Sequence, residues 1–282
     1  MGSTTSYNSV RTALEGANSR VAARRPDIYL QGSYRNATNI YGDSDVDIVV
    51  EHRGIFERDC SALDFEAIQR QKSAYTVATD SWEQFRDDVF RTLQDYYTSA
   101  RVRQGDKSIK VIFGLGRIAA DVVPAIGYKK YSYFFSDAVQ IKQDGIAFRN
   151  RARTSIVNFP KIHIANGEAK NAANRTNGRY KSMVRVFKNA RNRLVRDGLL
   201  VENSCPSYCV ECFVYNATDV CFGTSYQDSF AKIVDYLGAL PTQQFMSQNG
   251  IIPLFGPSPV QWNTAAAAAF LNALQNLWIN WA

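Results

Sequence analysis

The sequence has no long apolar run. Among its 282 residues, no stretch approaches the roughly 18 consecutive apolar residues that a membrane-spanning helix requires. The N-terminal segment MGSTTSYNSVRTALEG also lacks the basic and then apolar pattern of a secretory signal peptide. These absences argue against a membrane-spanning or secreted protein, so we expect a cytoplasmic one.

Histidine is scarce, and the Cys209-x-x-Cys212 pair, whose spacing invites a zinc interpretation, has no histidine near it in the sequence. His52 and His163 are the only histidines, and both are remote in sequence from the Cys209-x-x-Cys212 pair. The five cysteines are an odd number in a chain without secretory features, so we expect free thiols. Because the surrounding segment YCVECFVYN is mostly apolar, buried thiols explain this pair better than zinc ligands do.

The composition is that of a globular protein with a basic surplus. Hydrophobic residues make up 45% and charged residues 21%, which is ordinary for a soluble fold. The net charge is +7, and basic side chains are densest between Arg175 and Arg196. This balance favours an anionic partner such as nucleic acid, a membrane surface or nucleoside triphosphates, although a solvated surface would explain it equally well.

The pattern of the chain changes from mixed to helical. Strands are predicted at 27–32 and 45–51 and in the segments KSIKVIF and GRIAADVVPAI, the last two joined by a tight turn at 114–116. Helices are predicted at 6–23, 80–100, 181–196, 205–217 and 228–240, and from Asn263 or Thr264 onward. Residues 150–180 are polar and are predicted to cross between two parts. We therefore expect an α+β protein with a mixed domain at 1–160 and a helical one at 161–282.

Two aspartates lie on one face of the second predicted strand. Side chains alternate along a strand, so Asp45 and Asp47 point the same way. Two carboxylates on one face repel each other unless a cation lies between them. Carboxylate oxygens are ligands for Mg²⁺ or Mn²⁺, and two such ions about 3.5–4 Å apart can activate a hydroxyl and stabilise a leaving pyrophosphate. The pair therefore indicates metal-dependent phosphoryl chemistry.

Three more residues fit this chemistry. Asp121 lies in the apolar segment IAADVVPAI, where an aspartate is costly to bury without a partner. If this strand pairs beside residues 45–50, the three carboxylates converge on one face of a sheet. Gly32 permits close approach of the backbone to a phosphate, and Ser33 offers its N–H and its hydroxyl. The alternative for Gly32–Ser33 is a solvent-facing turn in the polar loop between the first two strands.

The segment GSYRNATNIYGDSDVDIVV resembles the Gly-Ser and paired-aspartate motif of the DNA-polymerase-β-like nucleotidyltransferases. Further similarities extend over nearly the whole chain, in YLQGSYRNATNI, PKIHIANGEAKN, RYKSMVRVFKNAR, PSYCVECFVYN and the terminal QWN and LWINW segments. They resemble the bacterial CD-NTases (cGAS/DncV-like nucleotidyltransferases), in particular the pyrimidine-using members of clade E. The resemblance implies a polymerase-β-like fold, a small mixed sheet with helices, plus a C-terminal helical lobe that closes a nucleotide cleft.

The resemblance also implies roles for individual residues in the N-terminal part. Asp45, Asp47 and Asp121 would hold two Mg²⁺ or Mn²⁺ ions and carry the catalysis. Gly32 and Ser33 would bind the triphosphate of the donor nucleotide. The complete set of three carboxylates argues for an active enzyme.

Three residues of the helical lobe would contact the nucleotide. Lys188 would bind its phosphates, with Lys181 and Arg185 as rivals and a surface charge as the alternative. Ser207 would touch phosphate, and Tyr208 would stack on the base. Ordinary core packing is the alternative for Tyr208.

Asn166 aligns with an asparagine that clade E enzymes use to choose uridine nucleotides. A carboxamide carries a donor and an acceptor together, so it can pair with N3–H and O4 of uracil. Adenine presents the reversed pattern, and a mismatched buried polar group costs about 1–3 kcal/mol. The alternative is a turn, because Ala-Asn-Gly-Glu is good turn chemistry.

The implied activity is the joining of two nucleoside triphosphates, UTP and ATP expected among them, into a cyclic dinucleotide. This product would be a second messenger for a cyclic-nucleotide effector in antiphage (CBASS) defence. The chain lacks the Cys/His zinc insertion of animal cyclic GMP-AMP synthase, so we expect no DNA activator. We also expect no membrane partner and a monomer. The alternatives are a transferase that uridylylates or adenylylates RNA or protein, and a catalytically inactive nucleotide-binding regulator. The second base, the linkage and the activating signal stay open.

Overall fold

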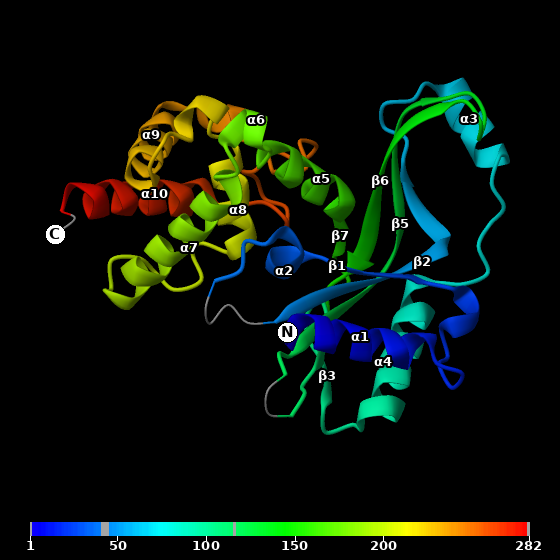
Figure 1. Ribbon diagram of the computed structural model, residues 1–282. Helices are drawn as coiled ribbons and strands as arrows, with labels where there is room; N and C mark the ends of the chain where they lie inside the picture. The colour runs from blue at the N-terminus through cyan, green and yellow to red at the C-terminus, as the bar shows by residue number, and fades with distance from the viewer. Residues whose placement is uncertain (1, 41–44, 115–116, 281–282) are drawn as a thin grey trace. The chain divides into compact units, whose positions relative to one another are not determined.

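A computed structural model of the chain describes residues 2–40, 45–114 and 117–280 (Figure 1). They form two compact units. Unit 1 comprises Met1–Gln31 and Ser44–Pro160, and unit 2 comprises Gly32–Asp43 and Lys161–Ala282. The sequence-based division at residue 160 placed residues 32–43 in the N-terminal domain, whereas the structure groups them with the C-terminal helices. Residues 115–116 of the predicted turn and residues 42–44 of the aspartate motif lie outside the described residues.

Unit 1 is built on a mixed sheet that has seven strands in the described part of the chain. The central path is β1-β2-β5-β4-β3, while β6 pairs with the C-terminal part of β5 and β7 pairs with β6. Among the strands described, β2 and β5 are the one parallel pair of this sheet. The strands are β1 (Asp27–Leu30), β2 (Val46–Asp59), β3 (Val102–Gln104), β4 (Ile109–Val111), β5 (Ala120–Phe134), β6 (Gln140–Arg149) and β7 (Ser155–Asn158).

The helices of unit 1 follow from the local sequence. They are α1 (Gly2–Glu15), the 3-10 turn η1 (Ala22–Arg24), α3 (Phe65–Ser73) and α4 (Trp82–Tyr97). The side chain of Ser81 accepts the N–H of Gln84 and caps α4, which begins close to the start of the helix predicted at 80–100. The prediction that the first helix reaches residue 23 is wrong. Gly16 follows its last residue, and glycine is a poor helix former.

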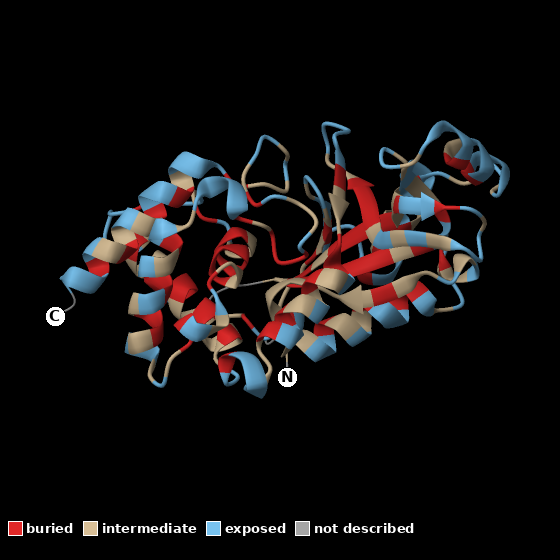
Figure 2. Ribbon diagram, turned by 90° about the horizontal axis from the view of Figure 1, so that it is seen from above, coloured by how far each residue is buried: buried red, intermediate tan, exposed pale blue. Residues whose placement is uncertain are grey.

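The core of unit 1 lies between the sheet and its helices. α1 and α4 lie side by side and pack against the sheet (Figure 1). Figure 2 shows buried residues along the central strands, and Val49, Val50 and Val122 are among the fully buried side chains. A nearly continuous apolar run is expected for a parallel pair that is covered on both faces. This rigid centre positions the residues at the N-terminal ends of β2 and β5.

Unit 2 is helical. Its elements are α2 (Gly32–Asn36), α5 (Pro160–Lys170), α6 (Ala173–Thr176), α7 (Tyr180–Arg196), α8 (Ser207–Tyr215), η2 (Asp219–Cys221), α9 (Tyr226–Ala239), η3 (Thr242–Gln244) and α10 (Thr264–Ile279). The core that α7, α8, α9 and α10 share includes Phe187, Phe213 and Phe270. The predicted helices at 181–196, 205–217 and 228–240 and the cap at Asn263 are confirmed.

Two segments differ from the prediction. Residues 150–180 were expected to be an irregular crossing, but they contain β7, α5 and α6. The buried residues of α5 after Pro160 are His163, Gly167 and Lys170. They have helical spacing, but none of them is a large apolar residue, so the sequence pattern did not indicate a helix. The predicted polar loop after β1 contains the short helix α2. In both places polar side chains are buried against partners elsewhere in unit 2.

Candidate active site

The three predicted carboxylates are brought to the same end of two adjacent strands. Asp47 on β2 lies directly beside Asp121 on β5 in the parallel ladder, and Asp45 immediately precedes β2. Asp45 and Asp47 are half-buried, whereas Val46 and Ile48 between and after them are buried. The expected pairing of the Asp121 strand beside residues 45–50 is therefore confirmed, with alternate residues facing opposite sides of the sheet.

Electrostatics at this end of the sheet favour a bound cation. Burial, and then the nearby charge of Asp45, raise the pKa of the Asp121 carboxyl above its ordinary value. Lys110 on β4 lies directly opposite Asp121, and its ammonium donates to Asp45 Oδ2 at 2.5 Å. This hydrogen bond and the charge of Asp45 raise the pKa of Lys110. The clustered carboxylates thus already attract one positive charge from the protein itself.

The donor set fits a hard divalent ion. Three carboxylates supply oxygen ligands of the kind that Mg²⁺ and Mn²⁺ prefer. Within the described ranges, no three His, Cys, Asp or Glu side chains converge closely enough to hold a metal ion. In this arrangement the carboxylate of Asp45 is bonded to Lys110. A metal ion at this site and the Lys110 ammonium would therefore compete for the same oxygen.

Replacing Lys110 by methionine is expected to tighten Mn²⁺ binding to the nucleotide-free protein. The side chain of Lys110 is 43% exposed, so its ion pair contributes little. An exposed ion pair contributes at most about 1 kcal/mol of free energy. This sets an upper limit of about fivefold on the decrease in the Kd for Mn²⁺. Titration of free Mn²⁺ by electron paramagnetic resonance measures the change.

The matched control for this prediction is Lys130→Met. Lys130 on β5 pairs with Asp59 on β2 at 2.6 Å in the same sheet, but at the other end of the two strands. This control is expected to leave Mn²⁺ binding unchanged. Unchanged or weaker Mn²⁺ binding in the Lys110 variant would show that its ammonium does not compete with the metal.

The Gly32–Ser33 motif begins α2 in unit 2. Gly32 has φ +68°, a left-handed conformation that favours glycine. The carbonyl of Ser33 accepts the N–H of Thr38 at 3.0 Å, which closes the turn of the chain after the helix. Gly32 and Ser33 are half-buried at the start of this helix, whereas Asn36 and Thr38 at its end are buried. The binding of phosphate by Gly32 and Ser33 stays a prediction.

A buried carboxylate in α8 anchors this segment. Glu211 accepts from Asn36 Nδ2 at 2.8 Å and from Thr38 Oγ1 at 2.9 Å, and it lies 3.1 Å from His163 Nε2. Burial alone would raise the pKa of Glu211, but the bond to His163 and the charges of His163 and Lys188 lower it. Glu211 is therefore ionised, and it joins the Gly-Ser segment to α5, α7 and α8. These bonds explain why residues 32–43 belong to unit 2.

The ammonium of Lys188 is part of the same network. Its side chain is 1% exposed, and Nζ donates to the carbonyl of Thr38 at 3.1 Å and lies 3.9 Å from Glu211 Oε2. The alternative that Lys188 is a surface charge is therefore wrong. Its rivals Lys181 and Arg185 are half-buried. The contacts direct Lys188 toward the segment that follows Gly32–Ser33, and its binding to phosphate stays a prediction.

Ser207 and Tyr208 form the first turn of α8. The hydroxyl of Ser207 accepts from Arg191 Nη1 at 3.0 Å. The ring of Tyr208 is half-buried and stacks on His163, with 5.4 Å between ring centroids and 24° between planes. Burial is the main cause that raises the pKa of Tyr208, so the phenol stays neutral. The roles of both residues toward a nucleotide stay predictions.

Asn166 lies in the middle of α5 and is half-buried. The alternative that it serves as a turn residue is therefore wrong. Its Nδ2 donates to the carbonyl of Gln248 at 2.9 Å. The carboxamide thus has a fixed orientation, which a base-reading group requires.

The sequence did not point to Lys110, Glu211 or Gln248. Lys110 could have been found from the predicted hairpin, because register places it opposite Asp121. Glu211 and Gln248 act through contacts far along the chain, for which a single sequence holds no signal. The Cys209 and Cys212 thiols, in contrast, are buried in the core of unit 2, as expected.

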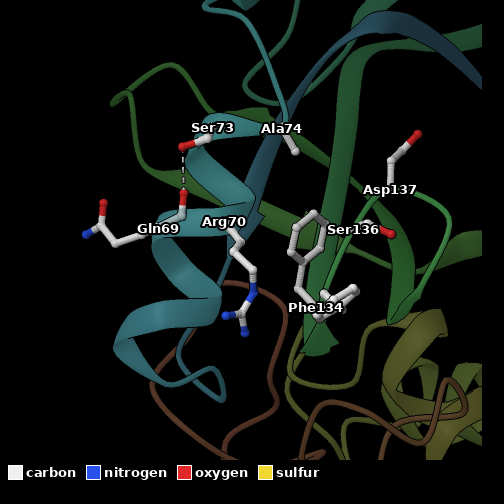
Figure 3. A pocket seen from close by; sticks show the side chains of 8 residues that line it. Gln69, Arg70, Ser73, Ala74, Phe134, Ser136 and Asp137 are labelled. Carbon is white, nitrogen blue, oxygen red and sulfur yellow. Dashed lines mark hydrogen bonds between the residues drawn. The ribbon is translucent and has the colours of Figure 1, made fainter.

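A cavity of about 500 Å³ lies in unit 1 between α3 and the turn from β5 to β6 (Figure 3). Arg70, Phe134 and Asp137 are among its lining residues. Asp121 lies near the start of β5 and Phe134 at its end. At roughly 3.3 Å per residue this separation is about 40 Å along the strand. The cavity is therefore distinct from the carboxylate site.

Comparison with known proteins places the chain in a family. Residues 165–279 match the family model of the cGAS/DncV-like nucleotidyltransferase C-terminal helical domain. The chain is 37% identical to the cyclic UMP-AMP synthase of Rhodothermus marinus, over 98% of this chain and 91% of that protein. It is 32% identical to a cyclic dipyrimidine nucleotide synthase of Legionella pneumophila, over 95% of this chain and 90% of that one.

A solved structure of one of these relatives has the same fold. The R. marinus cyclic UMP-AMP synthase, with the ligands Apcpp and Upnpp, matches with a TM-score of 0.89 and 36% identity, covering 100% of this chain and 92% of that one. The predicted α+β fold with a helical C-terminal part is thus confirmed. Enzymes of this family generally need divalent metal ions. None of the described helices is long and apolar enough to cross a bilayer. The chain belongs to the cGAS/DncV-like nucleotidyltransferases and is an enzyme of the cyclic nucleotide synthase type.

Proposed function

We propose that this enzyme joins two nucleoside triphosphates, at least one of them UTP, into a cyclic dinucleotide. Two divalent metal ions would be held by Asp45, Asp47 and Asp121. The observation that carries the proposal is the pairing of Asp47 with Asp121 across two parallel strands, with Asp45 two residues away. The Lys110 ammonium bonded to Asp45 supports a cation-binding role for this cluster, and so does the pKa of Asp121, which burial and the charge of Asp45 raise.

The chemistry follows from the carboxylates. A ribose hydroxyl of one nucleotide attacks the α-phosphate of the other, so that a new P–O bond forms and the bond to pyrophosphate breaks. Bound metal ions would supply charge neutralisation on the phosphates and a lower pKa for the hydroxyl. Asp121, with the metals, helps to activate the hydroxyl in this proposal, because it lies beside Asp47 at the end of the two strands where the carboxylates meet. A second round of the same step closes the ring.

The residues of unit 2 hold the substrates in this proposal. Gly32, Ser33 and Lys188 bind phosphate, together with the Ser207 hydroxyl, and Tyr208 stacks on a base. The network around Glu211 supports this grouping, because it joins the Gly-Ser segment to the helices that carry the other residues.

Asn166 selects uracil in this proposal. The fixed carboxamide supports it, and so does similarity to a cyclic UMP-AMP synthase and a cyclic dipyrimidine nucleotide synthase. We propose ATP as the other substrate. The product would serve as a second messenger for a cyclic-nucleotide effector in antiphage defence, made in the cytoplasm by a monomer that needs no DNA activator.

Product identification tests the function. The purified protein is incubated with every pair of NTPs and Mg²⁺ or Mn²⁺, and products are identified by mass after phosphatase treatment. A phosphatase-resistant cyclic dinucleotide that contains UMP is expected. Label that appears on RNA or protein instead would identify a uridylyl- or adenylyltransferase. Nucleotide binding without turnover would identify an inactive regulator.

A further inference from the structure

The carboxamide of Asn166 makes one hydrogen bond in which the donor and the acceptor are known. A backbone carbonyl can only accept, so the atom that faces the Gln248 carbonyl at 2.9 Å must be Nδ2 and not Oδ1. This bond uses one of the two Nδ2 hydrogens. Oδ1 and the other hydrogen remain, and they present one acceptor and one donor in a fixed order.

The carbonyl that makes this contact is itself fixed by the side chain of Gln248, which is 1% exposed. Its Nε2 donates to the carbonyl of His163 at 2.7 Å, one turn before Asn166 on α5. Its Oε1 accepts from the hydroxyl of Tyr180. The backbone N–H of Gln248 also contacts Cys212 Sγ at 3.3 Å. These contacts hold residue 248 against α5, α7 and α8.

The surrounding turn is rigid, and α5 approaches it closely. Ser247 and Ile252 bond through their backbones at 2.9 Å, and Gly250 has φ +70°. The side chain of Asn249 accepts the N–H groups of Ile251 and Ile252. On α5, a Cβ at Gly167 would collide with Gln248 Nε2. The turn therefore has little freedom to move relative to Asn166.

We infer that Gln248 is a positioning residue for base selection, which prevents the Asn166 carboxamide from flipping. This inference rests on the proposed role of Asn166. Uracil offers an acceptor at position 4 and a donor at position 3, whereas cytosine offers the reverse order. A free asparagine reads either base by turning its amide over by 180°. In this protein, turning the Asn166 amide over would place Oδ1 against the Gln248 carbonyl, where two acceptors repel each other. The amide therefore keeps one order of donor and acceptor, and that order selects uracil and rejects cytosine.

The variant Gln248→Leu tests the inference. Leucine keeps much of the volume but loses the bonds to His163 and Tyr180, so the 248 carbonyl loses the contacts that tie it to α5 and α7 and keeps only those of its turn and of Cys212. We expect the ratio of kcat/KM for UTP to that for CTP to fall by about three- to tenfold, the effect of one hydrogen bond. The change is expected mainly in the KM for CTP. An unchanged ratio in a folded variant would overturn the inference.

Gly167→Ala is a second variant that disturbs the same contact from the other side. Alanine is favoured over glycine in a helix, so this change does not weaken α5 itself. Its Cβ displaces Gln248 Nε2, and we expect the same loss of preference for UTP over CTP. If Gln248→Leu does not fold, Gly167→Ala provides the test instead. An unchanged ratio of kcat/KM for UTP to that for CTP in Gly167→Ala would also overturn the inference.

Gln261→Leu is the matched control. The Nε2 of Gln261 bonds the carbonyls of Pro253 and Phe255 at 3.0 Å in the same C-terminal segment. It is expected to leave the UTP to CTP ratio unchanged. A fall in the ratio like that of Gln248→Leu would assign the effect to general loosening of the segment, against the inference.

A double-mutant cycle with Asn166→Ser separates the two proposals. If Gln248 acts through Asn166, then Gln248→Leu has no further effect on the ratio in the Asn166→Ser background. If Asn166→Ser alone leaves base preference unchanged, the proposed role of Asn166 fails. If Asn166→Ser changes it but Gln248→Leu does not, only the positioning role of Gln248 fails.

Discussion

Replacing Asp121 by asparagine is expected to reduce the rate of cyclic product formation by about 10³-fold or more, because it removes a proposed metal ligand that helps to activate the hydroxyl. Asparagine keeps the volume and can still hydrogen bond, so β5 should pair with β2 as before. Asp47→Asn is expected to act in the same way, since Asp47 lies beside Asp121. Rates are measured from the conversion of radiolabelled UTP and ATP with Mg²⁺ and separately with Mn²⁺.

The control for this loss is Asp59→Asn. Asp59 also lies on β2 and pairs with a lysine of β5 at 2.6 Å, as Asp45 pairs with a lysine of β4. It lies at the other end of the strand from Asp47. Asp59→Asn should therefore keep nearly all of the activity. Parental rates in Asp121→Asn and Asp47→Asn with both metals would contradict the assignment of the carboxylates.

The carboxylate site could be predicted from the sequence because its signals are local. Alternation along one strand places Asp45 and Asp47 on the same face. An aspartate inside an apolar run, at Asp121, indicates a special environment whatever the fold. The sequence left the pairing of the Asp121 strand beside residues 45–50 as a condition, and the register of β2 with β5 meets it. The long apolar helices of unit 2 were predicted for the same reason.

The polar interior of unit 2 could not be predicted. Lys188 and Glu211 are charged residues, and pattern-based reasoning places charges at the surface. They are buried because each supplies the partner that the other needs, together with His163 and Thr38. Such partnerships join segments up to 175 residues apart, as Asn36 and Glu211 show. No local pattern carries that information.

The hydrogen bonds of Glu211 and Lys188 determine which predicted site residues lie in the same unit. The Gly-Ser segment lies in sequence between β1 and β2, yet it is bonded to α8 through Glu211 and to α7 through Lys188. The predicted phosphate-binding and base-reading residues therefore share one unit, while the carboxylates share the other. Changes in nucleotide preference and changes in metal dependence should accordingly be separable by mutation.

Replacing Asn166 by serine is expected to lower the use of UTP relative to ATP by about ten- to hundredfold in kcat/KM, the range for losing one polar contact with a base. Serine is shorter, and its hydroxyl cannot present a donor and an acceptor side by side as a carboxamide does. Competition between labelled UTP and ATP, with products separated by chromatography, measures the ratio. The rate of ATP use itself should change little, because the carboxylates of unit 1 are intact.

Asn272→Ser provides the matched control for this last prediction. Asn272 is an exposed asparagine within α10, so it tests the same chemical change in a helix without a predicted ligand. It should leave the UTP to ATP ratio unchanged. If Asn166→Ser also leaves the ratio unchanged, base choice lies elsewhere. Because Asn166 is helical and not in a turn, its remaining role would then be the bond to Gln248, which would appear as lowered stability to urea without any change in base preference.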